Sequence, residues 1–201
     1  MVLSLFALAA CGGGGTSGAS PADVFREFAQ AAAAENGDRL WELLSERMKA
    51  DVARQQFTSA ILPRLRDDYL PVASGRTLLD VELDDEVALA ALEGNGAGPG
   101  AEAAVLRRES GGWRVQLSEL DLVYGSGDLD FQVNARREDR ALIDVRAWVD
   151  GAEATVKRDE GSLLPTFRVR ANDPLESGRH SVVAYVEAGA RSGAIAWTFD
   201  L

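Results

Sequence analysis

After residue 20, apolar residues recur at helical spacing through the first third of the chain. Ser20 and Pro21 are typical of a helix start, with the serine as N-cap and the proline in the first turn. The apolar residues that then share one helix face are Val24, Phe25, Phe28, Ala31 and Ala32. A second helix is predicted from Asp38, and a third over about 51–61 that Pro63 ends or bends. This region predicts three amphipathic helices.

The pattern then changes to a period of two, which indicates strands. Four runs follow one another between turn-forming residues, at 77–83, 86–93, 102–109 and 113–119. Residues 94–100, GNGAGPG, are typical of a loop, and Ser110-Gly111-Gly112 of a short hairpin connection. In the first run Leu79, Val81 and Leu83 alternate with Asp80 and Glu82. We therefore expect an α+β domain over 20–118, in which helices cover one face of an antiparallel sheet.

From Leu120 the pattern indicates strands alone. Six strand-like runs have the spacing of a β-sandwich, at 130–135, 141–151, 153–157, 165–171, 180–188 and 194–201. Asp150-Gly151 is a strong hairpin signal. Trp197 falls on the bulky side of the last run, which we expect to be buried, whereas Trp148 falls on the polar side of its run and is expected to be exposed. This pattern predicts a second domain over 120–201 that folds on its own.

The first 19 residues predict an export and anchoring signal. Residues 1–10, MVLSLFALAA, are too few to cross a bilayer but match the apolar core of a signal peptide. Leu8-Ala9-Ala10-Cys11 resembles the lipobox of bacterial lipoproteins, which implies that Cys11 carries acyl chains such as palmitate and becomes the mature N-terminus. The Gly-rich segment 11–19 then predicts a flexible tether. The alternatives are an ordinary signal peptide and a buried strand with a chance cysteine. No Lys or Arg precedes the apolar run, so we expect the reading frame to begin upstream.

Composition narrows the classes of function. The chain has 201 residues and a net charge of −11, with 32 acidic and 21 basic residues, which disfavours nucleic-acid binding. One His and one Cys exclude a His/Cys metal cluster and a disulfide within the chain. We therefore expect no cofactor and assign no metal ligand and no catalytic residue.

Two family resemblances follow from these patterns. The opening PADVFREFAQAAAAENGDRLWELLSERMK, followed by four strands, resembles the NTF2-like (cystatin-like) superfamily. That resemblance implies a cone that can enclose a ligand, with Trp41, Tyr69 and Trp113 as candidate lining residues. The order Pro174-Leu175, Gly178 to Ala184, then Trp197 to Phe199 resembles a bacterial Ig-like repeat, a module that serves as a spacer or an adhesive surface.

Two further features admit a chemical and a structural interpretation. His180 could be a lone base or metal ligand, but it stands where the Ig-like pattern has a histidine, so we expect it to bond a loop backbone. The acidic residues between 80 and 86 could suggest calcium, but they fit the solvent side of a strand and its turn, and they lack the spacing of an EF-hand.

Together these features predict a non-catalytic binding or spacer protein of the cell envelope, outside the cytoplasm and anchored to a membrane through Cys11. Its partner would be an envelope protein or a glycan. One alternative is an NTF2-like small-ligand carrier or enzyme tethered outside the cell. The other is cell-wall glycan binding through the Ig-like domain, with Trp148 as the binding aromatic residue. All three rest partly on analogy of fold.

Overall fold

The computed structural model describes residues 18–94, 100–125, 129–159 and 164–201. Its first helix is the predicted one. Helix α1 spans Pro21–Ala33, and the Ser20 side chain accepts a hydrogen bond from the Asp23 backbone N–H at 3.3 Å. The apolar face of α1 is buried, as the spacing of its residues predicts. The N-cap therefore fixes where helix α1 begins.

The predicted second helix is broken into two short ones. Helix α2 spans Gly37–Leu43 with Asn36 as its N-cap, and α3 spans Glu46–Asp51 with Ser45 as its N-cap. Between them Leu44 is extended and forms a bridge with Val115 of the sheet. The prediction of a single helix from Asp38 is wrong because this sheet contact and the Ser45 cap interrupt the helical pattern.

The predicted third helix runs further than expected. Helix α4 (Arg54–Gln56) leads through a π-helical turn (Phe57–Ile61) into α5 (Leu62–Tyr69). Pro63 lies in the first turn of α5 and does not end the helix. A proline lacks the N–H for an i→i−4 bond and its ring crowds the preceding turn, so a wide π turn just before it accommodates both effects.

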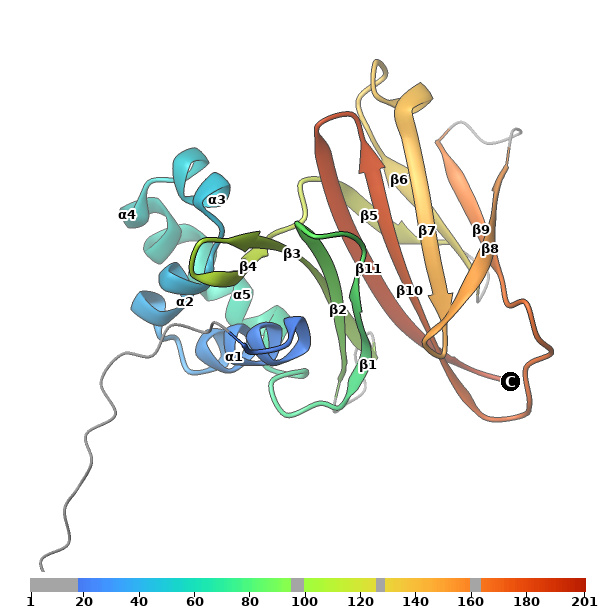
Figure 1. The fold of residues 1–201 in the computed structure, drawn as a ribbon, viewed down its shortest axis with the longest axis horizontal. Coiled ribbons are helices and arrows are strands. Elements are labelled where there is room, and N and C mark those ends of the chain that lie inside the picture. The colour runs from blue at the N-terminus through green and yellow to red at the C-terminus, as the bar shows by residue number, and fades with distance from the viewer. Residues whose placement is uncertain (1–17, 95–99, 126–128, 160–163) are drawn as a thin grey trace, which may run out of the picture.

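The first sheet has the predicted strands in antiparallel order β1-β2-β3-β4. They span Thr77–Glu82 (β1), Val87–Glu93 (β2), Ala101–Glu109 (β3) and Gly112–Gln116 (β4). The helices lie on one face of this sheet (Figure 1). A mixed α+β architecture is thus what the structure shows for this part of the chain.

The second sheet has seven strands in the order β11-β10-β7-β8-β9-β6-β5. They span Asp121–Tyr124 (β5), Asp130–Asn134 (β6), Ile143–Val149 (β7), Ala152–Asp159 (β8), Thr166–Arg170 (β9), Arg179–Ala188 (β10) and Arg191–Asp200 (β11), with a 3-10 turn at Arg140–Leu142. Strand β5 is missing from the sequence prediction because it is short and mostly exposed. The predicted Asp150-Gly151 hairpin is confirmed, since both residues have positive φ and Val149 pairs with Ala152.

The seven-stranded sheet folds over on itself through β8. Residues 152–154 of β8 pair with β7, and residues 155–159 pair with β9. This crossing brings the edge strand β5 beside β11 and encloses a core that includes Phe131, Val182 and Trp197. The two halves of the sheet thus form two layers that face one another (Figure 1).

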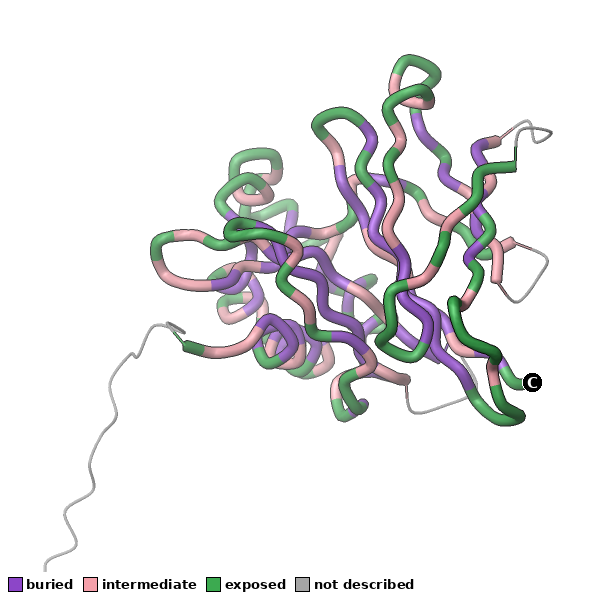
Figure 2. The backbone as a smooth tube through the Cα atoms, turned by 45° about the vertical axis from the view of Figure 1, so that its right-hand side comes forward, coloured by how far each residue is buried: buried purple, intermediate pink, exposed green. Residues whose placement is uncertain are grey.

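Buried apolar side chains form one core inside each part and a third core between them. Under the helices lie side chains such as Phe25, Phe28 and Leu106, and inside the folded sheet lies the core around Trp197. The third cluster joins β1, β2 and β3 to β7, β10 and β11, and consists of Leu79, Val87, Leu89, Ala91, Ala101, Val105, Trp148, Val183, Tyr185 and Ala196. We call it the shared core. Figure 2 shows buried backbone running through both sheets.

Polar contacts fix the joint between the two parts. The Glu119 N–H donates to the Ser192 carbonyl at 3.0 Å, and Arg47 of α3 pairs with the Glu119 carboxylate at 2.8 Å. Arg47 also donates to the Ala190 carbonyl in the β10–β11 turn. At Gly193 a Cβ would lie 2.3 Å from Ser118 Oγ, so a larger residue there would require the Ser118 side chain to move. The predicted boundary at 118–121 therefore lies in a segment that is tied to both parts.

Candidate functional site

The predicted anchor residue, Cys11, lies outside the described residues. The three aromatic residues expected to line a cavity belong to the helical core instead. Tyr69 is buried with its ring edge-on to Phe25 and Phe28, and Trp41 is edge-on to Phe57. Trp113 is also buried, but it borders a surface recess. The structure does not bring Trp41, Tyr69 and Trp113 together around one cavity, because two of the three are packed against other rings.

The prediction that Trp148 is exposed is wrong. Its side chain is 4% exposed and belongs to the shared core, opposite Val183 of β10. The side of β7 that looks polar in sequence faces the first sheet at this position, and Arg146 covers the indole with its guanidinium 5.3 Å from the ring. The glycan-binding surface that Trp148 was expected to provide is therefore occupied by the rest of the protein. Trp197, in contrast, is buried as predicted.

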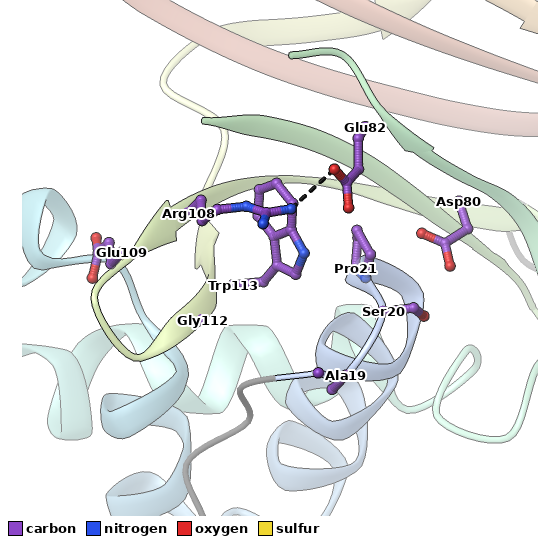
Figure 3. A pocket seen from close by; sticks show the side chains of 10 residues that line it. Ala19, Ser20, Pro21, Asp80, Glu82, Arg108, Glu109, Gly112 and Trp113 are labelled. Atoms are coloured by element: carbon purple, nitrogen blue, oxygen red, sulfur yellow. Dashed lines mark hydrogen bonds and ion pairs between the residues drawn. The ribbon is translucent and has the colours of Figure 1, made fainter. Parts of the chain in front are cut away.

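A recess of about 650 Å³ lies where the chain enters α1 (Figure 3). It is bounded by the start of α1, the edge strand β1 and the β3–β4 hairpin. Arg108 and Trp113 are direct cross-strand partners, and the guanidinium lies 4.3 Å from the ring centroid. Figure 3 shows Glu82 reaching toward the same guanidinium, and the two groups form an ion pair at 2.9 Å. The Trp113 indole is thus covered by the Arg108 guanidinium, which is itself paired with the Glu82 carboxylate.

The other carboxylates of this recess also have partners. Asp80 accepts a hydrogen bond from the Ala22 N–H at 3.3 Å, at the positive end of the α1 dipole. Glu109 accepts one from the Glu46 N–H at 2.9 Å, at the start of α3. Since each of these acidic groups already stabilises a helix end or pairs with Arg108, the recess holds no uncompensated charge among them. These contacts within the fold account for the position of each carboxylate in the recess.

A second hollow, of about 330 Å³, lies at the edge of the shared core. Strand β4 ends at Gln116, which pairs with Val105, so residues 101–104 of β3 have no partner strand on that side among the described residues. The chain crosses this gap to begin β5, which contacts β11. We call the hollow the edge groove; its lining residues are Glu102, Ser118, Leu120, Asp121, Leu122, Val123, Tyr124, Ala194, Ile195 and Ala196.

Glu102 distinguishes the edge groove from the recess. Burial and the nearby Asp68 carboxylate raise the pKa of Glu102 to about 7. Its carboxyl forms no hydrogen bond or ion pair with the residues that the structure describes. Sequence reasoning missed this residue. The available signal was a glutamate within the otherwise small and apolar run AEAAVL, preceding a strand centre that is buried on both faces.

His180 has the structural role that the sequence predicts. Its Nδ1 lies 2.7 Å from Asp150 Oδ2 and its Nε2 lies 2.7 Å from the Glu176 carbonyl oxygen. The bonds to Asp150 and Glu176 raise the pKa of His180. Burial alone would raise the pKa of Asp150, but its hydrogen bonds with His180 and Ser181 lower it instead. This clamp connects the β7–β8 turn to the start of β10.

No group of three or more His, Cys, Asp or Glu residues in the described part of the chain is placed to hold a metal ion. None of the described helices is long and apolar enough to span a membrane. In the acidic turn between β1 and β2, the Asp84 carboxylate binds the backbone of the turn itself. Its Oδ1 accepts hydrogen bonds from the N–H groups of Glu86 and Val87, both at 2.7 Å.

Comparison with family models, curated proteins and solved structures found no match to this chain.

Proposed function

We propose that this chain is a lipid-anchored protein of the cell envelope, outside the cytoplasm, that works as a binding or spacer protein rather than as an enzyme. The observation that carries the proposal is the order of its parts. The lipobox-like Leu8-Ala9-Ala10-Cys11 is followed by a Gly-rich tether, and the tether ends at Ser20, the residue that caps α1. The sequence thus passes from anchor to tether to fold without any intervening segment.

The layer order supports a spacer role. The helices, the four-stranded sheet and the two layers of the seven-stranded sheet follow one another across the molecule, with α1 and the C-terminus on opposite sides (Figure 1). Residues 12–19 can span about 28 Å when fully extended. A lipid on Cys11 would therefore hold the helices near the membrane and direct the seven-stranded sheet away from it. The shared core makes this projection rigid, because the two parts cannot move apart without exposing apolar surface.

Two family assignments belong to the same proposal. Helices on one face of a four-stranded antiparallel sheet support an NTF2-like domain over 20–118. A folded antiparallel sheet with Trp197 and Phe199 in its core supports an Ig-like domain over 120–201. In both, the function proposed is to present a surface to an envelope partner, and the seven-stranded sheet is the part that would lie furthest from the lipid.

Membrane fractionation of Cys11→Ser tests the anchor. The substituted protein should leave the membrane fraction and stay folded, since Cys11 precedes the predicted tether in sequence and the three described cores are built from residues that follow this segment. A matched control is Ser17→Ala in the tether, which should remain in the membrane fraction. The anchor is disproved if Cys11→Ser still sediments with membranes and is released only by detergent.

A further inference from the structure

The edge groove has an apolar floor with one ionisable group at its side. Leu120, Leu122 and residues 194–196 provide the apolar surface, and the Tyr124 ring, 39% exposed, lies at the rim against Trp197 at 5.8 Å. The two charged residues in the lining, Glu102 and Asp121, are both acidic. A volume of about 330 Å³ is at the lower end for pockets that hold small organic molecules.

The groups around Glu102 oppose its ionisation. From α5 the Asp68 carboxyl repels it, and Tyr69 is neutral and buried. From β5 comes Tyr124, whose pKa is raised by burial and by Glu102 itself. Asp68 in turn has a raised pKa, because of burial and then the adjacent Asp67. No described group among these supplies a positive charge, so the carboxylate at this position is uncompensated.

A half-buried carboxylate without a partner costs stability unless something neutralises it. In the recess at α1, a carboxylate of the same sheet is neutralised within the chain, since Glu82 pairs with Arg108. In the edge groove the compensating cation would have to come from outside the chain. A metal ion is a poor candidate, because the floor is apolar and gives few oxygen ligands. An organic cation can use the carboxylate, the Tyr124 ring and the apolar floor together.

We propose that the edge groove is a binding site for a small organic ammonium ion with an apolar body, held by the Glu102 carboxylate and the Tyr124 ring. Ammonium binding stabilises the ionised form of Glu102, so it lowers the pKa of this group and takes place with proton release below neutral pH. Affinity should consequently increase as the pH rises through about 7. The site belongs to the folded part alone and does not depend on the lipid anchor.

Isothermal titration calorimetry of the full-length protein with phenethylammonium tests this. Binding is expected at pH 8, and at pH 5.5 it should weaken by roughly tenfold or more, as the ionised fraction of Glu102 falls. Phenethyl alcohol, which has the same apolar body without the charge, should bind at least about tenfold more weakly at pH 8. Benzyltrimethylammonium distinguishes the two kinds of contact: it keeps the cation–π contact but cannot donate a hydrogen bond.

The variants Glu102→Gln and Glu86→Gln remove the same charge at different places. Glu86 is exposed in the β1–β2 turn, away from the groove. Glu102→Gln should abolish the pH dependence and weaken phenethylammonium by at least about tenfold, whereas Glu86→Gln should bind like the parent. Thermal melting confirms that both variants fold. The proposal is overturned if phenethylammonium does not bind at pH 8, if it binds Glu102→Gln as tightly as the parent, or if the alcohol binds equally well.

Discussion

Strands β7, β10 and β11 bury side chains on both of their faces, and the two faces differ in what covers them. The inner face, which carries Trp197, is closed by the other layer of the same folded sheet. The outer face, which carries Trp148, is covered by the four-stranded sheet and ends at the edge groove. One apolar surface is thus closed within a single sheet, while the other requires two sheets to meet.

This difference assigns separate roles to the two cores. The core around Trp197 decides whether the seven-stranded sheet folds, because its residues come from both layers. The shared core decides whether the two parts form one body, because it is built from both sheets. The shared core borders the edge groove, where residues 101–104 have no neighbouring strand among those described and the Glu102 carboxylate is unpaired. We therefore expect ligand binding to depend on residues at this edge, and the largest losses of stability to come from substitutions in the two cores.

Removing the first sheet altogether should have the largest effect. A fragment of residues 120–201 would expose one whole side of the shared core, including Trp148, Val183 and Tyr185. The sequence alone predicts that this fragment folds independently, whereas exposure of a contiguous apolar patch predicts self-association or aggregation. Size-exclusion chromatography of the fragment and of the full chain measures this. A monomeric fragment with a sharp melting transition would show that the shared core is dispensable.

Trp197→Ala should be among the most damaging single substitutions. The indole contacts Phe131 inside the folded sheet, at 6.0 Å between ring centroids, and Tyr124 at the rim of the edge groove, at 5.8 Å. Truncating a buried Trp costs about 3–5 kcal/mol, which is comparable with the stability of a small domain. Urea unfolding followed by circular dichroism measures the loss. Leu201→Ala, at an exposed position, is the control and should change stability by less than about 0.5 kcal/mol.

Trp148→Ala should cost far more than the substitution of an exposed aromatic residue, because the Trp148 side chain is almost fully buried, at 4% exposed. A loss of about 3–5 kcal/mol is expected, the range for truncating a buried Trp. Because Trp148 joins the two sheets, its removal should also separate one unfolding transition into two. Differential scanning calorimetry detects that separation. A single transition with a loss below about 1 kcal/mol would mean that the shared core contributes little to cooperativity.

The sequence predicts most of the local structure here, apart from the helix break at Leu44 and the π turn before Pro63, and it fails where two sheets meet. Ser20, the strand runs and the Asp150-Gly151 turn are local signals, and the structure confirms them. The shared core is not local, yet it has a signature: in β2 both faces are apolar, with Ala88 toward the helices and Leu89 toward the other sheet. An antiparallel strand with two apolar faces is covered on both sides.

The errors at the site residues also come from contacts between segments that are distant in sequence. Trp148 was misplaced because alternation within one strand shows which residues share a side but does not show what covers that side. Glu102 escaped prediction because its environment comes from α5, β5 and β11 together, which are distant in sequence. Neither position could be derived from spacing, since each depends on how the two sheets dock.

Glu102→Gln should stabilise the protein at alkaline pH and not at acid pH. The folded-state pKa of about 7 lies above the usual 4.5, so the native state binds this proton more tightly than the unfolded state. The stability that this proton contributes is complete below pH 4.5 and is lost as the pH rises through about 7. The expected gain for the glutamine variant at pH 8 is roughly 1–3 kcal/mol. Urea unfolding at pH 4 and pH 8 measures it, with Glu86→Gln as the control; an equal effect at both pH values would contradict the assignment.

The smallest effect on stability is expected at the His180 clamp, formed by the bonds of His180 to Asp150 and Glu176. The bonds to Asp150 and Glu176 raise the pKa of His180 above 6.5, so its contribution is complete below 6.5 and is lost as the pH rises through the folded-state pKa. The pKa of Asp150 is lowered from 3.8, so its contribution is present above 3.8 and is lost as the pH falls through the lowered value. The clamp is therefore strongest between about pH 4 and 6.5, where Nε2 still donates to the Glu176 carbonyl. His180→Gln should lower the melting temperature most near pH 5.5 and less at pH 9, as thermal melts at the two pH values would show. If the loss were greater at pH 9, the histidine would be neutral in the folded protein and the clamp would act through a single hydrogen bond.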